Sequence, residues 1–123
     1  MGGRIPAGRS GDLVGAVQVS ASGWAHRPVA VAGSLRARRT GLRPMALGWG
    51  MLIGGRSVHA RGMVEPLTVV GIDRDRVVVS VRRLGLGGLA SIPGAAAVLE
   101  LPGHLPTPSP GDVLRWAPID DEW

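Results

Sequence analysis

His59, Arg61 and Met63 are the residues of this 123-residue chain whose types and spacing come closest to forming a site. They alternate along the segment "SVHARGM", so in a β-strand their side chains would share one face. An imidazole beside a guanidinium could bind an anionic ligand. We favour the simpler interpretation, in which this histidine is a partly buried residue that bonds to backbone and Met63 fills a gap in the core. Catalysis would further require a partner that orients the imidazole.

Other groupings of reactive side chains are weaker. The three histidines, His26, His59 and His104, are far apart, and none has a histidine or an acid two or four residues later. There is no cysteine, which excludes disulfides, thiolate zinc sites and cysteine catalysis. The glycine-rich segment 85–88 cannot be a P-loop, because the chain has no lysine. We therefore expect no metal and no cofactor.

Charge divides the chain into two halves. Residues 1–62 carry nine Arg and one acid, a net charge of +8, whereas residues 63–123 carry five Arg and eight acids, a net charge of −3. The basic half could bind an anionic partner. An acidic protein is favoured over nucleic acid, because the Arg run at 36–39 has no aromatic residues around it on which bases could stack.

The arrangement of apolar residues predicts a mainly β domain. Short apolar or alternating runs are bounded by Gly, Pro and Asp, which is typical of strands separated by turns. The expected strands are 13–19, 28–32, 50–53, 67–73, 76–83, 95–101 and 113–117, with a further strand around His59. One short helix is expected near residues 34–42, where Ser34 can cap the start and Gly41 the end. The result would be a small β-sandwich or barrel.

The segments 67–73 and 76–83 predict an antiparallel hairpin, which we place at the centre of the sheet. Alternation along its second strand puts Val77, Val79 and Val81 on one apolar face. On this prediction Val79→Asp would bury an unpaired charge and unfold the domain.

The strongest signal is an ordered set of short blocks between about residues 30 and 115. They comprise Ala32, Arg38, Gly41 and Leu42; Gly50, Met51 and Leu52; Val58, His59, Gly62, Met63, Pro66, Leu67, Val69 and Asp73; Val98 to Gly103; and Gly111, Asp112 and Val113. In this order they resemble the bacterial and archaeal domain-of-unknown-function family 192, also called the UPF0127 family. The resemblance implies a compact, mostly β domain similar to a jelly roll, and no reaction. It also implies that an aspartate usually follows the Pro-Leu pair, where this chain has Thr68. Any family site that uses this acid is expected to be lost here.

These observations favour a small non-catalytic binding or accessory domain. The candidate binding residues are His59, Arg61, Met63, Arg38 and Glu100. An enzyme of unknown reaction that uses His59 is the alternative, and nucleic-acid binding through the Arg-rich half is the third possibility. Relatives of the family in actinobacteria can lie beside pilus-assembly or secretion genes, which suggests a link to those processes.

The ends of the chain predict its organisation and location. Residues 1–11 are expected to form a flexible arm, residues 12–117 a single β-rich domain and residues 118–123 an acidic tail. The longest uncharged stretch is interrupted by Pro93 and is too short to span a membrane. We expect a cytoplasmic protein. Arg4 and Arg9 precede an apolar stretch that could also act as an atypical export signal.

Overall fold

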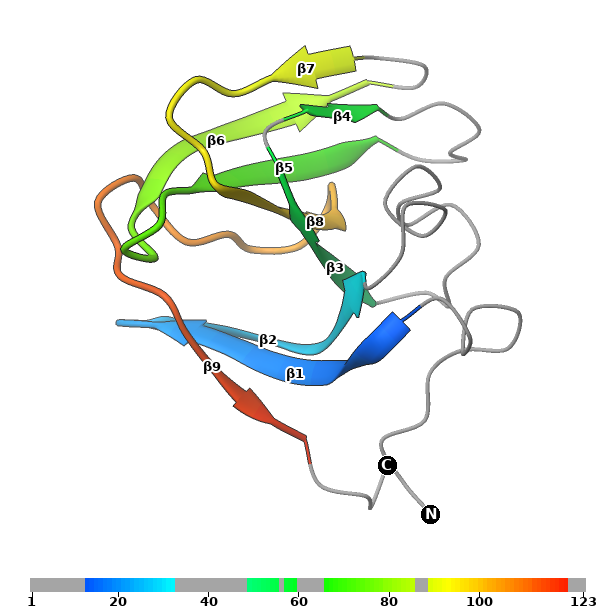
Figure 1. The fold of residues 1–123 in the computed structure, drawn as a ribbon, viewed down its shortest axis with the longest axis vertical. Coiled ribbons are helices and arrows are strands. Elements are labelled where there is room, and N and C mark those ends of the chain that lie inside the picture. The colour runs from blue at the N-terminus through cyan, green and yellow to red at the C-terminus, as the bar shows by residue number, and fades with distance from the viewer. Residues whose placement is uncertain (1–12, 33–48, 56, 60–65, 86–88, 120–123) are drawn as a thin grey trace.

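The computed structural model describes residues 13–32, 49–55, 57–59, 66–85 and 89–119. Strands dominate this part of the chain and no helix occurs in it (Figure 1). The strands are β1 (Leu13–Ala21), β2 (Trp24–Ala32), β3 (Gly50–Gly54), β4 (Ser57–His59), β5 (Leu67–Ile72), β6 (Val78–Leu84), β7 (Leu89–Ser91), β8 (Ala97–Pro102) and β9 (Arg115–Pro118). The mainly β prediction is confirmed.

Seven of these strands form one sheet with the order β6-β5-β8-β3-β2-β1-β9, and β4 pairs with β7 in a separate ribbon. Neighbours in the large sheet are antiparallel except for β2 and β3, which run parallel. The sheet curls until the chain just before β9 reaches the other edge. There Val113 bridges to Val77, and the amide of Leu114 donates to the carbonyl of Arg76 at 2.8 Å. The domain is therefore barrel-like, although the sheet does not close fully.

Apolar side chains fill both faces of this sheet, because alternate residues of its central strands belong to two different clusters. The first cluster contains Ala30, Trp49, Met51, Ile53, Leu67, Val69, Leu84, Ile92 and Val98. The second, which lies inside the curl, contains Val19, Val29, Leu52, Val70, Ile72, Val78, Leu99, Leu101 and Leu114. All six residues of β5 are buried. This explains why its sequence is an apolar run rather than an apolar–polar alternation.

The predicted hairpin is present as the pair β5–β6. Its turn has no glycine, and Asp73 supplies the turn chemistry instead. One carboxylate oxygen of Asp73, Oδ1, accepts hydrogen bonds from the amides of Asp75 at 2.8 Å and Val77 at 2.9 Å. The left-handed position of the turn falls on Arg76, whose φ is +68°. An aspartate side chain therefore stabilises a turn that usually depends on glycine.

Two details of the hairpin prediction are wrong. The hairpin does not lie at the centre of the sheet, because β6 is an edge strand. The predicted faces of β6 also fail, because Val79 is 40% exposed whereas Val78 is 1% exposed. The cause is a β-bulge: Gly71 pairs with Ser80 and Ile72 with Val78, which leaves Val79 without a partner position on β5. The extra residue shifts the alternation by one, so Val78 rather than Val79 points into the core.

The remaining strand predictions are confirmed with shifted ends. β2 begins at Trp24, four residues earlier than expected. The short strand β7 was not expected from the sequence. The predicted helix near residues 34–42 lies outside the described residues, as does the expected arm at 1–11.

Candidate functional site

The residues singled out in the sequence do not form a site in the described part of the structure. His59 is the last residue of β4 and pairs with Leu89 of β7, which confirms its place in a strand. Arg38, Arg61 and Met63 lie outside the described residues. A shared surface of His59 with these residues therefore stays a prediction.

Glu100 is the one member of the predicted set whose side-chain environment is described, and it lies in the core. It is 1% exposed and stands in β8 between Met51 of β3 and Val69 of β5. Since both neighbours belong to the first apolar cluster, the carboxylate faces that side of the sheet. Thr68 is also buried, and it precedes Val69 on β5, so its side chain lies on the opposite face. A dissolved ligand has no direct access to Glu100.

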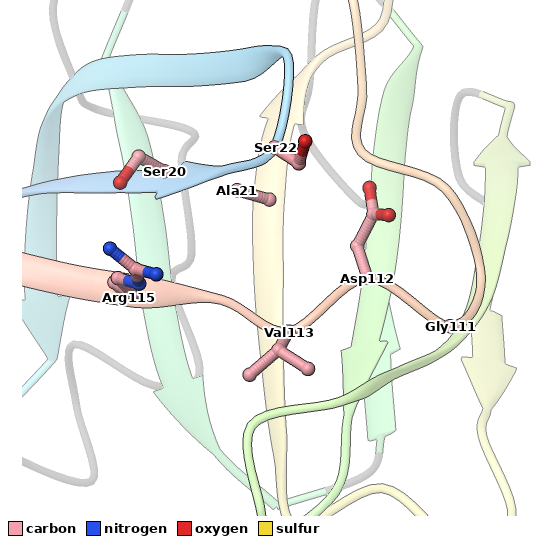
Figure 2. A pocket seen from close by; sticks show the side chains of 7 residues that line it. All are labelled: Ser20, Ala21, Ser22, Gly111, Asp112, Val113 and Arg115. Carbon is pink, nitrogen blue, oxygen red and sulfur yellow. The ribbon is translucent and has the colours of Figure 1, made fainter.

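A surface cavity of about 510 Å³ lies where the β1–β2 turn meets the chain entering β9. Two segments almost ninety residues apart in the sequence form its walls (Figure 2). Its lining residues are Ser20, Ala21, Ser22, Gly111, Asp112, Val113 and Arg115. The cavity therefore depends on the pairing of β1 with β9, which brings these two segments side by side.

Hydrogen bonds hold the β9 side of this cavity in place. The amide of Gly111 donates to the carbonyl of Val78, and the amide of Val78 donates to the carbonyl of Asp112, each at 2.8 Å. The side chain of Asp112 reinforces the turn, because its Oδ2 accepts from the amide of Ser109 at 2.9 Å. Gly111 has a φ of +93°, a conformation that favours glycine. This "GD" pair thus has a defined structural role.

A second contact ties the proline-rich loop 105–110, which leads into Gly111, to the start of β2. The indole Nε1 of Trp24, directly after the β1–β2 turn, donates to the carbonyl of Pro106 at 3.0 Å. The segments on either side of the cavity are therefore linked to each other beside it, as well as to the sheet. Such links hold a site in shape before any ligand arrives.

The lining combines opposite charges with hydroxyl groups. Arg115 of β9 is paired with Ser20 of β1, so the two side chains are neighbours on the same face of the sheet. Figure 2 shows the carboxylate of Asp112 directed from its loop toward the turn that carries Ser22. Val113 adds an apolar side chain that is 58% exposed. The cavity can thus offer a cation, an anion and an apolar contact to one small molecule.

Behind this wall, Arg76 stacks on Trp116. The guanidinium carbon lies 4.1 Å from the ring centroid of Trp116, the residue that follows Arg115 in β9. Trp116 packs against the second apolar cluster, so it points to the side of β9 opposite Arg115. This cation–π contact, together with the bond from Leu114 to Arg76, attaches the cavity wall to the hairpin turn.

Sequence reasoning missed this site, apart from the Gly111-Asp112-Val113 block, which was noted as part of the family resemblance. Ser20, Ser22 and Arg115 belong to no motif, and only the pairing of β1 with β9 brings them together.

Two further findings concern metals and membranes. Among the described residues no three His, Asp or Glu side chains are grouped so that they could hold a metal ion. No helix in the described ranges has the length and apolar character needed to cross a bilayer.

Comparisons with known proteins identify structures with a similar fold but do not identify a function. No protein-family model and no curated protein sequence matches the chain. The structure is similar to that of a protein of unknown function from Novosphingobium aromaticivorans DSM 12444, with a TM-score of 0.70 and 22% identity over 92% of this chain and 91% of the other. It is also similar to a protein of Sinorhizobium meliloti 1021 that is provisionally described as a transcription regulator, with a TM-score of 0.61 and 26% identity over 82% of this chain and 92% of the other. The chain is mainly β and shares its fold with these two proteins.

Proposed function

We propose that this protein is a small non-catalytic binding domain of the 192 family type, and that it holds a small polar ligand in the cavity between the β1–β2 turn and β9. The observation that carries the proposal is the cavity itself: its walls are hydrogen-bonded into position and present Asp112 and Arg115 to one space. Small-molecule sites are usually preformed concavities with a few polar groups, and about 510 Å³ lies within their common size range.

Two glycines of the family-like blocks, Gly50 and Gly103, contribute to the fold rather than to the cavity. A Cβ at Gly103 would lie 2.6 Å from the carbonyl oxygen of Pro66, and one at Gly50 would lie 3.0 Å from Leu101 Cδ2. Both glycines therefore permit close approach between neighbouring segments. Close packing of this kind stabilises the fold and does not by itself specify a ligand. An accessory role beside pilus-assembly or secretion proteins is the setting that we propose for such a domain.

A screen of polar metabolites by ligand-observed NMR tests the proposal, with amino acids, dipeptides, sugars, carboxylic acids and nucleotides as probes. Ser22→Trp would place a bulky side chain in the cavity, whereas Ser91→Trp changes an exposed serine of β7 outside it. We expect wild type and Ser91→Trp to bind the same compounds and Ser22→Trp to lose them. Binding that survives Ser22→Trp, or a wild type that binds none of the probes, contradicts the proposal.

An enzyme that uses His59 remains the competing proposal. It requires turnover, so a hydrolase screen separates it from the binding domain. Activity that disappears in a folded His59→Ala variant would support the enzyme and defeat the non-catalytic assignment.

Nucleic-acid binding is a second candidate because of the provisional description of the Sinorhizobium meliloti protein. Arg82 and Arg83 are both exposed on the edge strand β6, where they could contact phosphates. A gel-shift titration with duplex DNA at several salt concentrations tests this function. Binding that prefers one sequence and persists at high salt would favour a regulator, whereas weak binding that salt abolishes would argue against one.

A further inference from the structure

The chemistry of the lining narrows the class of ligand, and this inference rests on the proposed function. We propose that the cavity binds a short peptide whose two ends are free. Such a peptide is a zwitterion, with an ammonium group at one end and a carboxylate at the other. Its carboxylate would lie against Arg115, its ammonium group against Asp112 and an apolar side chain against Val113.

The carboxylate end of the ligand is assigned from Arg115 and Ser20. A guanidinium presents parallel N–H donors that match the two oxygens of a carboxylate. Arg115 and Ser20 are cross-strand partners, so the serine hydroxyl can add a third donor beside the guanidinium. Figure 2 shows both side chains on the same side of the β1–β9 pair.

The ammonium end is assigned from Asp112. Its Oδ2 already accepts a hydrogen bond from the amide of Ser109, which fixes the orientation of the carboxylate. An ionised carboxylate has about four acceptor positions, so this single bond leaves capacity for an ammonium group. Ser22, on the turn that faces Asp112, adds a hydroxyl from the other wall of the cavity.

The apolar contact comes from Val113, which stands between the two charged residues in the sequence and is 58% exposed. A valine this exposed loses water-accessible apolar surface when an apolar group covers it. Ala21 adds a second small apolar surface to the lining. A polar sugar would leave this apolar surface without a matching partner.

The opposite charges of Asp112 and Arg115 also disfavour ligands that carry only one kind of charge. A simple anion would meet Asp112, and a simple cation would meet Arg115, so each would gain one attraction and one repulsion. A molecule that carries both charges, separated along its length, gains both attractions. This distinguishes a free dipeptide from capped peptides and from inorganic ions.

Isothermal titration with three related compounds tests the assignment: the dipeptide Ala-Leu, its N-acetylated form and its C-terminal amide. The acetyl group removes the ammonium charge, and the amide removes the carboxylate. We expect Ala-Leu to bind at least about tenfold more tightly than either capped form, as is usual when a charged partner is left unpaired.

Two variants assign each charge to its residue. Arg115→Gln should abolish the preference for the free acid over the amide, and Asp112→Asn should abolish the preference for the free amine over the acetylated form. Asparagine keeps an oxygen that can accept from Ser109, so the turn should survive, and a melting curve verifies this. Arg74→Gln, at the exposed hairpin turn outside the cavity, is the matched control and should bind like wild type.

The outcomes separate this inference from the proposed function. Equal binding of all three compounds, or a preference that Arg115→Gln leaves intact, overturns the zwitterion assignment. If Ala-Leu does not bind but another probe binds and is lost in Ser22→Trp, the ligand class is wrong and the binding domain stands. If no probe depends on the cavity, both proposals fail.

Discussion

Gly71 and Ile92 provide a quantitative test of the packing on the outer face of β5. A Cβ built on Gly71 would lie 2.6 Å from Cγ2 of Ile92 and 3.4 Å from its Cδ1. Carbon atoms in contact are normally about 3.5–4.0 Å apart, so the first distance is too short by about 1 Å. Ile92 is 1% exposed and belongs to the first apolar cluster, so neighbouring atoms resist its displacement. Gly71→Ala should therefore destabilise the domain through a clash with one identified side chain.

The magnitude follows from two opposing effects. Forcing an extra methyl group into a packed core costs about 1–3 kcal/mol. Replacing glycine by alanine in ordinary strand backbone restores about 0.4–1 kcal/mol, because the unfolded chain loses freedom. The net loss should be about 1–2 kcal/mol. Ile92→Ala by itself should cost about 2–5 kcal/mol through the cavity that it leaves. In that background the clash is absent and the new methyl group enters the cavity, so Gly71→Ala should become neutral or stabilising.

Urea denaturation of the four proteins, followed by tryptophan fluorescence, measures this double-mutant cycle. We expect a coupling free energy of about 1–3 kcal/mol between the two positions. A Gly71→Ala variant that loses the same stability in both backgrounds, to within about 0.5 kcal/mol, would refute the reasoning. In that case the cost would arise from the backbone of β5 and not from contact with Ile92.

Three further predictions concern the hairpin and the cavity wall. Val78→Asp should unfold the domain, because it buries a charge. Val79→Asp, at the exposed bulge position, should change the free energy of unfolding by less than about 1 kcal/mol. Equal shifts of the melting temperature in the two variants would contradict the bulge assignment. Trp24→Phe removes the indole donor to Pro106 and should lower the free energy of unfolding by about 1 kcal/mol, and an unchanged urea midpoint would mean that the bond adds nothing. Asp73→Ala removes the acceptor of two turn amides and should lower the free energy of unfolding by about 1–2 kcal/mol. Asp73→Asn should lower it less, because the amide oxygen can still accept these bonds. Calorimetry that finds the two variants equally stable would count against the turn hydrogen bonds.

The local pattern of the chain was sufficient to predict most strands and the β5–β6 hairpin. Apolar runs of strand length, separated by Gly, Pro and Asp, produce this signal because turns and strands depend on neighbouring residues. The order of the family-like blocks likewise predicted a compact β domain, and two solved structures with similar folds agree with it. The sequence alone also excluded cysteine chemistry, since the chain has no cysteine.

The faces of the strands and the position of the cavity were decided by the tertiary structure. A single extra residue at Val79 reverses the alternation of β6, and periodicity cannot reveal a bulge whose partner strand is unknown. Glu100 was a candidate binding residue from the sequence, yet pairing with β3 and β5 on either side encloses it in the core.

The cavity depends most strongly on contacts that are distant in sequence. Ser20 and Arg115 come together because β1 pairs with β9, and Asp112 is held there by backbone bonds to the start of β6. Ser20 and Arg115 belong to no motif, and Asp112 stands out only through the family-like block 111–113. Local sequence determines which stretches become strands, whereas the choice of partners and edges depends on the free energy of packing the whole sheet.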